Sequence, residues 1–255
     1  MLTSESLLSG VKNKSARIGI GLGADKGKVL RSRAEAERAG FSNIILYDDP
    51  VLMARDLRDG RIDAAVRGDI ESNRAMAAVR ETFNVNRVLR AAFMEPRGGR
   101  MFLLAPVGID EGWSIEEKLE LARRGQMVLG RLGIRPVIGI MSGGRSSDRG
   151  RMKEVDRTID DAQEVVAILR REDIDARDVQ ILIENAASEC DMLIAPDGIS
   201  GNLVFRTLHF LGGGKALGAP VLNIDRVYID TSRAKENYLD SIYLAAALVT
   251  HRESE

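Results

Sequence analysis

Short apolar runs alternate with amphipathic stretches along the first third of the chain. Three bounded, largely apolar runs have the length of buried strands: 17–21, 42–47 and 64–66. Apolar residues recur at helical spacing in the stretches that follow them: 28–39, 50–57 and 72–82. Strand and helix in alternation predict a parallel sheet with helices on its faces.

The middle of the chain follows a different pattern. Apolar runs at 88–94 and 101–105 flank Glu-Pro-Arg-Gly-Gly-Arg, a spacing that suits an antiparallel hairpin. Ser114 and Glu117 form a capping box before a helix that extends to Leu132. A strand at 136–141 and helices over 152–170 are expected next, whereas 181–187 fits either type of element.

The last third is organised around 192–214. An apolar run at 192–195 reads as a buried strand, and a glycine-bearing polar turn follows it at 197–202. The next apolar residues recur at helical spacing until three glycines end the pattern at 212–214. Two strands, 220–223 and 227–229, and a helix over 238–249 are expected after that. Open α/β sheets build their sites at such strand-to-helix turns, although an ordinary connection would look the same.

Composition narrows the class of protein. The 255 residues include 37 Lys and Arg against 38 Asp and Glu, and the net charge of −1 argues against bulk attraction to nucleic acid or anionic membranes. One cysteine, Cys190, and two histidines, His209 and His251, make a zinc site of the usual kind a poor expectation, so no metal is predicted. With no signal peptide and no apolar run of membrane-spanning length in the sequence, a cytoplasmic protein is expected.

Two glycine-rich turns are candidates for ligand binding. Gly19, Gly21 and Gly23 follow the first strand, but Lys26 stands where the dinucleotide fingerprint needs its third glycine. S-adenosylmethionine sites use a similar turn with a carboxylate after the second strand, where Asp48 and Asp49 lie; an ordinary tight turn is the favoured interpretation. In the loop 142–147, two glycines permit close backbone approach, serines supply hydroxyls and Arg145 can bind phosphate oxygens. A flexible loop with a solvated arginine is the alternative.

A third candidate follows the strand at 227–229. Ser232 and Arg233, with Asp240 in the next helix, could hold an anion and move a proton. The alternative is that Ser232 caps a helix and Asp240 faces solvent.

These stretches, in this order, resemble the phosphate acetyltransferase and butyryltransferase family. Its Pro-Asp-x-x-x-Gly-Asn turn is matched by 196–202, and its Asp-Leu-Ser-Arg by 230–233 with one change. Asp240 matches the family's later aspartate if one residue is inserted. Of the family's Ser-Phe-Ser-Thr-Lys-Gly loop only Ser142 clearly remains at 142–147, and Glu71 replaces a usual histidine after the Gly68 segment.

The whole chain is more similar still to the methanogenesis marker protein 4 group, also called methyltransferase-related protein MtxX. The short length, the Arg-Gly-Asp-Ile segment at 67–70 and the Ala-Pro-Asp-Gly-Ile-Ser-Gly-Asn run at 195–202 carry this resemblance. The group's name implies a link to methyl transfer in methanogenic archaea.

The resemblance implies an α/β fold of the isocitrate/isopropylmalate dehydrogenase type, with two three-layer α/β/α domains, mostly parallel sheets and an interdomain cleft. The first domain would comprise 1–83 plus 220–255, and the second would comprise 84–219. The cleft would be lined by the 142–147, 197–202 and 230–233 loops, and the protein would be a homodimer.

The resemblance also implies roles for the candidate residues. In the family's mechanism a carboxylate deprotonates a thiol such as that of coenzyme A, and the thiolate attacks an acyl phosphate. Asp240 would be the base, Arg233 would neutralise phosphate charge and Ser232 would hydrogen-bond the reacting oxygen. Substrate would be positioned by eight further residues: Ser142, Gly143, Gly144, Arg145, Asp197, Ser200, Gly201 and Asn202.

Three functional interpretations therefore stand. A phosphate acyltransferase-type enzyme, with coenzyme A as a substrate and no firmly implied cofactor, is the leading one. A methyltransferase or a subunit of one is the second, with S-adenosylmethionine, corrinoid and pterin donors left open. A non-catalytic binding protein on this scaffold is the third, favoured by Glu71 and by the loss of Thr-Lys from the phosphate loop.

Overall fold

By its internal packing the chain divides into two compact units. The computed structural model describes residues 3–250; residues 1–2 and 251–255, at the two ends of the expected first domain, lie outside the described residues, as does His251. The N/C unit comprises residues 4–88 and 217–250, and the middle unit comprises residues 89–216 together with Thr3. The chain leaves the N/C unit after Val88 and re-enters it inside a strand, between Ala216 and Leu217.

The sheet of the N/C unit is mostly parallel. Its strands are β1 (Ile18–Gly21), β2 (Ile44–Tyr47), β3 (Ala64–Val66), β9 (Lys215–Pro220) and β10 (Val227–Asp230), in the order β2-β1-β3-β10-β9. The first four strands of that order run parallel, and β9 pairs antiparallel with β10. The carboxyl ends of β1, β3 and β10 therefore meet at one edge of this sheet.

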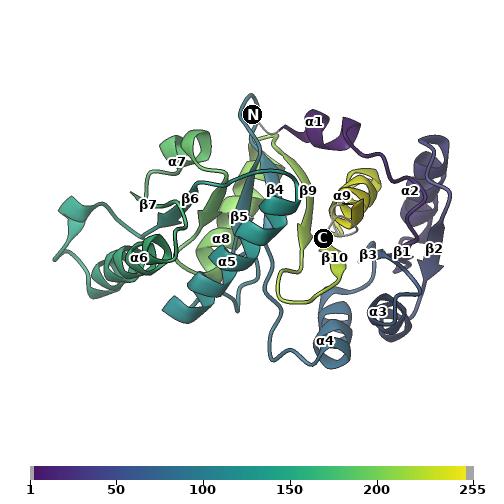
Figure 1. Ribbon diagram of the computed structural model, residues 1–255, viewed down its shortest axis with the longest axis horizontal. Helices are drawn as coiled ribbons and strands as arrows, with labels where there is room; N and C mark the ends of the chain where they lie inside the picture. The colour runs from purple at the N-terminus through teal and green to yellow at the C-terminus, as the bar shows by residue number, and fades with distance from the viewer. Residues whose placement is uncertain (1–2, 251–255) are drawn as a thin grey trace. The chain divides into compact units, whose positions relative to one another are not determined.

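Helices cover both faces of this sheet (Figure 1). They are α1 (Ser4–Ser9), α2 (Lys26–Arg38), α3 (Pro50–Arg58), α4 (Ser72–Phe83) and α9 (Leu239–Thr250). Figure 1 shows α2 and α9 on one face and α3 and α4 on the other. On the α3–α4 face a buried apolar cluster includes Met53, Leu57, Val79 and Tyr228, so burial of these side chains holds the layers together.

The middle unit has a second, mostly parallel sheet. Its strands are β4 (Ala92–Glu95), β5 (Phe102–Ala105), β6 (Ile138–Met141), β7 (Ala176–Gln180) and β8 (Met192–Ile194), in the order β4-β5-β8-β6-β7. β4 and β5 form the expected antiparallel hairpin, whereas β5, β8, β6 and β7 run parallel. The carboxyl ends of β5, β8 and β6 thus lie side by side, with β8 in the centre.

Helices connect these strands. They are α5 (Ile115–Arg131), the 3-10 turn Ser146–Asp148, α6 (Lys153–Arg171), α7 (Ile183–Glu189), α8 (Gly198–Arg206) and the π-helical turn Thr207–Leu211. α5 and α6 pack against each other, α5 also packs on β8, and α6 packs on β6 and β7. Ser114 caps α5 by accepting a bond from the amide of Glu117, as the capping box predicted. The expectation of α/β units with mostly parallel sheets is confirmed.

Two element predictions need correction, two elements were not predicted, and one segment of open type can be assigned. The strand expected at 220–223 is wrong: β9 begins at Lys215, directly after the three glycines, and only Pro220 of the expected segment belongs to it. β7 and α1 were not predicted, because β7 is a half-exposed, polar edge strand and α1 has a single turn and a half of weak pattern. The helix expected from Leu203 begins earlier, at Gly198, and ends in the π-helical turn. The open segment 181–187 is largely helical, in α7.

Within residues 3–250 no helix is long and apolar enough to cross a membrane. The same residues contain no group of three or more His, Cys, Asp and Glu side chains that could hold a metal ion.

Candidate functional site

Three loops of the N/C unit converge at the carboxyl edge of its sheet. They are the loop after β1 at 22–25, the loop after β3 at 67–71 and the loop after β10 at 231–237. The first two interlock closely: a Cβ atom at Gly23 would overlap the carbonyl oxygen of Asp69. Gly23 thus makes room for the protein's own backbone, which argues against a ligand occupying this turn.

A buried ion pair joins the second loop to the third. The Arg67 guanidinium donates through Nε to the Asp230 carboxylate and through Nη1 to the carbonyl oxygen of Ile70. The side chains of Arg67 and Asp230 are 5% and 12% exposed, so the pair is largely removed from water. Thr231 strengthens the junction, since its hydroxyl donates to the carbonyl oxygen of Gly68 at 2.9 Å. These bonds fix the start of the Asp230–Arg233 segment.

Asp69 connects the same loops to helix α2 and to the start of α9. Its carboxylate accepts from the Asp25 amide at 2.7 Å and from the Tyr238 hydroxyl at 3.3 Å. Lys28 lies 3.6 Å from the same carboxylate and donates to the carbonyl oxygen of Arg233 at 2.6 Å. Burial and the Asp69 charge raise the pKa of the Tyr238 hydroxyl, which therefore remains a donor. The Asp230–Arg233 segment, which was expected from sequence to carry chemistry, is thus held by Lys28 through the carbonyl oxygen of Arg233.

The three predicted catalytic residues all belong to this unit. The Ser232 hydroxyl accepts from the Ala234 amide at 3.2 Å, and the Arg233 side chain is exposed. Asp240 lies in the first turn of α9 and is partly buried. Ser232 and Arg233 are adjacent in the loop after β10, whereas Asp240 lies in the helix that follows this loop.

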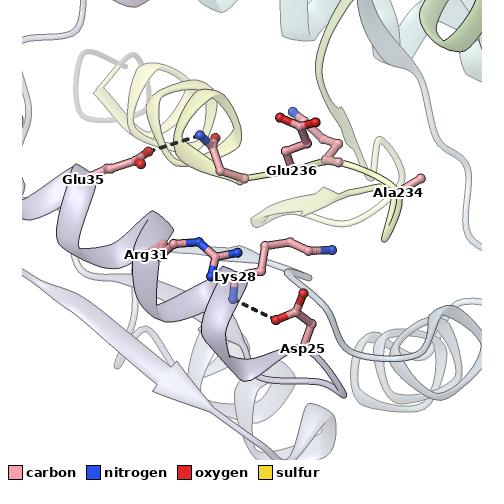
Figure 2. Close-up of a pocket in the computed structure, with 8 residues that line it drawn as sticks. Asp25, Lys28, Arg31, Glu35, Ala234 and Glu236 are labelled. Atoms are coloured by element: carbon pink, nitrogen blue, oxygen red, sulfur yellow. Dashed lines mark hydrogen bonds between the residues drawn. The ribbon is translucent and has the colours of Figure 1, made fainter.

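A pocket of about 550 Å³ opens beside this loop, between the face of α2 and the segment 234–237. Eight residues line it: Asp25, Lys28, Arg31, Glu35, Ala234, Lys235, Glu236 and Asn237. Figure 2 shows Arg31, Lys28 and Glu35 on α2 and Glu236 on the loop segment across from this helix. Lysine, arginine and carboxylates thus alternate around a space that can admit a small polar molecule.

Lys235 is the residue in this pocket that sequence reasoning missed. Its ammonium lies 3.4 Å from the carbonyl oxygen of Leu217 in β9 and 3.4 Å from the Ser241 hydroxyl in α9. Burial lowers the pKa of Lys235 to about 8, while the Asp240 charge acts in the opposite direction. The one available sequence signal was its position two residues after Arg233, and a lysine in an exposed-looking loop gives no sign of burial.

At the carboxyl edge of the middle unit's sheet, the Ser142 loop is closed by its own bonds. The Ser142 hydroxyl is buried and donates to the carbonyl oxygen of Gly144 at 2.9 Å. The amide of Gly143 donates to the Thr158 hydroxyl at 2.8 Å, and the amide of Arg145 donates to the Asp148 carboxylate at 2.8 Å. The Arg145 side chain is exposed, so it is the member of the predicted set that remains open to a ligand.

The Asp197–Asn202 segment is not a loop but the first turn of α8. The Asp197 carboxylate caps the helix, accepting from the Ser200 amide at 2.8 Å and from its hydroxyl at 3.0 Å. Asn202 donates to the carbonyl oxygen of Val107 at 2.8 Å, and a Cβ atom at Gly201 would overlap the carbonyl oxygen of Pro106. Asp197 and Ser200 therefore stabilise the start of α8, and Gly201 and Asn202 pack this helix against the backbone after β5. Each of these residue types has a structural role that requires no ligand.

The predicted residues fall into two groups. The Ser142 loop and the Asp197–Asn202 turn lie in the middle unit, at neighbouring strand ends; Ser232, Arg233 and Asp240 lie in the N/C unit.

The remaining candidates have structural partners. Asp49 caps α3 by accepting from the Val51 amide at 2.8 Å, and Asp48 is exposed. Glu71, at the position of the usual histidine, caps α4 by accepting from the amides of Asn73 and Arg74. Cys190 is buried, and burial raises the pKa of its thiol to about 11, which disfavours the reactive thiolate.

Comparison with known proteins identifies clear relatives. No family model matches the chain. A protein of Methanosarcina mazei named "Putative methyltransferase mtx subunit X" is 36% identical over 263 residues, covering 96% of this chain and 94% of the relative.

Solved structures with a similar fold include phosphotransacylases and dehydrogenases. A branched-chain phosphotransacylase from Enterococcus faecalis superposes with a TM-score of 0.74 at 16% identity, covering 91% of this chain and 99% of that chain. A 4-hydroxythreonine-4-phosphate dehydrogenase from Klebsiella pneumoniae gives a TM-score of 0.56 at 12% identity, covering 95% of this chain and 86% of that chain. At these identities the likeness concerns the fold alone.

Proposed function

The chain belongs to the family of the Mtx subunit X proteins, and from this premise we propose that it is a transferase of the phosphate acyltransferase type, acting on a phosphate-bearing or coenzyme A-type substrate. The relatives are named as methyltransferases, which are a class of transferase, and the fold is similar to that of a phosphotransacylase. Fold alone does not assign an activity, so the proposal depends on the site in the N/C unit.

The observation that carries the proposal is the rigid loop after β10, at the carboxyl edge of the N/C sheet. Ser232 and Arg233 follow a strand whose end is fixed by the buried Arg67–Asp230 pair. Lys28 holds the backbone of Arg233 in place, while the Arg233 guanidinium itself is exposed. An exposed arginine on a rigid backbone, next to a serine hydroxyl, suits binding of a phosphoryl group, because a guanidinium can donate two parallel hydrogen bonds to phosphate oxygens.

In the proposed reaction Arg233 binds the phosphate of an acyl phosphate and Ser232 hydrogen-bonds the reacting oxygen. A carboxylate or another base near Arg233, with Asp240 as the candidate from the family pattern, converts the acceptor thiol to a thiolate. The thiolate attacks the acyl carbon, and phosphate leaves with its charge neutralised by Arg233. Ser142, Arg145 and the Asp197–Asn202 turn are proposed to position the substrate, and the active form is proposed to be a homodimer.

An acyl phosphate/coenzyme A exchange assay tests this function. The wild-type protein should exchange phosphate with at least one member of a panel of short, branched and long acyl phosphates. Arg233→Ala should reduce kcat/KM by about 10²- to 10³-fold, the usual cost of removing one donor to developing charge. Arg33→Ala is the matched control, because Arg33 lies on the α2 surface and pairs with Glu37. Absence of wild-type exchange with every member of the panel rules the proposal out.

Methyl transfer is the second candidate, and the name of the relatives is the observation that favours it. The turn that would receive S-adenosylmethionine is filled by Asp69 of the chain itself. Calorimetric titration with S-adenosylmethionine separates the two functions: micromolar binding favours methyl transfer from this donor, and no heat leaves only other donors for that function.

A non-catalytic binding protein is the third candidate. It is favoured because Asp197, Ser200 and Asn202 already make hydrogen bonds within the protein. Glu71 also favours it, because this residue caps a helix where the family has a histidine. Binding of coenzyme A without exchange of any acyl phosphate would support this candidate.

A further inference from the structure

Lys235 occupies an unusual position for a lysine in a surface loop. Its amine is held between β9 and α9, 3.4 Å from the Leu217 carbonyl oxygen and 3.4 Å from the Ser241 hydroxyl. The Ser241 hydroxyl in turn donates to the same carbonyl oxygen, so β9 and α9 define the place of the amine together. The same residue lines the pocket of about 550 Å³ between α2 and the segment 234–237, which follows Ser232 and Arg233 along the chain.

Charged groups approach Lys235 from each surrounding element. Asp240 lies in the first turn of α9, and Glu236 follows Lys235 in its own loop. Helix α2 and its cap present both signs of charge to the pocket: Asp25, Lys28, Arg31 and Glu35 (Figure 2). The charge of Asp240 raises the pKa of the lysine amine and so opposes the effect of burial.

We propose that Lys235 is the proton acceptor for the nucleophile of the transfer reaction, and that Asp240 tunes it rather than taking the proton itself. This inference rests on the proposed function and adds to it a catalytic residue that the family's Asp-x-Ser-Arg pattern does not contain.

The physical reason is a match of proton affinities. Burial brings the pKa of Lys235 to about 8, so about a tenth of the population carries a neutral amine at pH 7 and about half does so at pH 8. A free thiol has a pKa of about 8.5, and a base is most efficient when its pKa lies near that of its partner and near the working pH. An ordinary carboxylate is a far weaker base toward a thiol, since its pKa is about 4.

The proton and electron pairs balance as follows. The neutral Lys235 amine takes the thiol proton and becomes an ammonium, leaving a thiolate. The thiolate forms a carbon–sulfur bond at the acyl carbon of the acyl phosphate, and the carbon–oxygen bond to phosphate breaks with its electron pair on the phosphate. The Lys235 ammonium returns the proton to the departing phosphate, which restores the neutral amine.

The pH dependence of exchange tests the role of the lysine. Wild-type kcat/KM should rise with pH and level off above an inflection near 8, because the neutral amine is the active form. Lys235→Arg keeps a cation and hydrogen-bond donors for Leu217 and Ser241 but cannot lose its proton in this range. It should lower kcat/KM by about 10²- to 10⁴-fold, the usual contribution of a general base, with the inflection near 8 abolished. Lys26→Arg, a change at an exposed lysine of α2, is the matched control and should leave rate and inflection unchanged.

Asp240→Asn separates the two candidate bases without touching the lysine. Because the Asp240 charge raises the pKa of Lys235, its removal should move the inflection to lower pH while substantial activity remains. If Asp240 were the base, the same change would abolish activity at every pH and leave no inflection to move.

The outcomes distinguish this inference from the proposed function. Absence of wild-type exchange rejects both. Wild-type exchange together with full activity and an unshifted inflection in Lys235→Arg rejects the role of Lys235 and leaves the proposed function standing. Should Lys235→Arg fail to fold, as judged by its thermal transition, the shift in Asp240→Asn decides: an acid shift supports the role of Lys235, and complete loss of activity in a folded protein overturns it.

Discussion

The predicted site segments at the carboxyl edges of the two sheets are held in place by different kinds of contact. In the N/C unit the loops are held by buried charge: Arg67 pairs with Asp230, and Asp69 gathers the amide of Asp25 and the hydroxyl of Tyr238. In the middle unit the Asp197–Asn202 turn is held by its own capping carboxylate, Asp197, and by the Gly201 approach to Pro106. A buried ion pair of that unit, Arg90 with Glu111, involves the loop after β5 and not the predicted turns.

This difference indicates where chemistry can take place. Buried charges raise or lower the proton affinity of their neighbours, and the N/C unit contains the strongly perturbed Lys235 beside an open pocket. The predicted turns of the middle unit offer hydroxyls and amides that already have partners within the unit. In our proposal the reacting groups therefore belong to the N/C unit, and the residues of the middle unit position the substrate.

Removing one partner of the buried ion pair should have the largest effect. Arg67→Met leaves the Asp230 carboxylate buried without its guanidinium, which typically costs about 3–5 kcal/mol of unfolding free energy. Urea unfolding followed by circular dichroism measures the loss. The double variant Arg67→Met/Asp230→Leu removes both charges, and it should recover part of that loss. A single variant as stable as the wild type would show that the pair does not hold this edge.

The corresponding test in the middle unit is steric. Gly201→Ala places a methyl group against the carbonyl oxygen of Pro106, and we expect a loss of about 1–3 kcal/mol with displacement of the α8 start. Gly130→Ala is the control, since a Cβ atom at Gly130, near the end of α5, meets nothing within 4 Å and should be neutral or stabilising by about 0.5–1 kcal/mol. Equal effects of the two changes would remove the argument that Gly201 is required by close packing.

The order of elements was predictable because strong local patterns agreed with the fold. The parallel strands β1, β3 and β8 are short apolar runs between turn residues. The start of α5 is marked in the sequence by the capping box of Ser114. β7 and β9 escaped prediction for a physical reason: one is a polar edge strand, and the other contains a glycine, ends in a proline and directly follows three glycines, a composition typical of a turn.

The candidate site was predictable to a smaller extent. Ser232 and Arg233 could be singled out because they follow a strand and match a family pattern. The position of the Lys235 amine depends on tertiary contacts with Leu217 and Ser241. The capping bond between Asp197 and Ser200 is local, but it forms only because α8 begins directly after Asp197. Loop sequence states which groups are present but not which neighbours have already engaged them.

The smallest expected effect concerns Glu71, which caps α4 at the N/C edge as Asp197 caps α8 at the middle edge. Hydrogen bonds from the amides of Asn73 and Arg74 lower the pKa of the Glu71 carboxyl below its ordinary value of 4.5. Its charged form therefore stabilises the fold above pH 4.5, and this contribution is lost as pH falls through the depressed pKa of the folded state.

Glu71→Gln keeps the shape of the cap and removes the charge. The variant should be slightly less stable than the wild type at pH 7, and the difference should shrink as the pH is lowered below 4.5, because the wild-type carboxyl is then neutral as well. Urea unfolding of both proteins at pH 7, 5, 4 and 3 measures the difference. A difference that stays constant down to pH 3 would mean that the ionised carboxylate contributes nothing to the cap, and that buried pairs alone account for the electrostatic character of this edge.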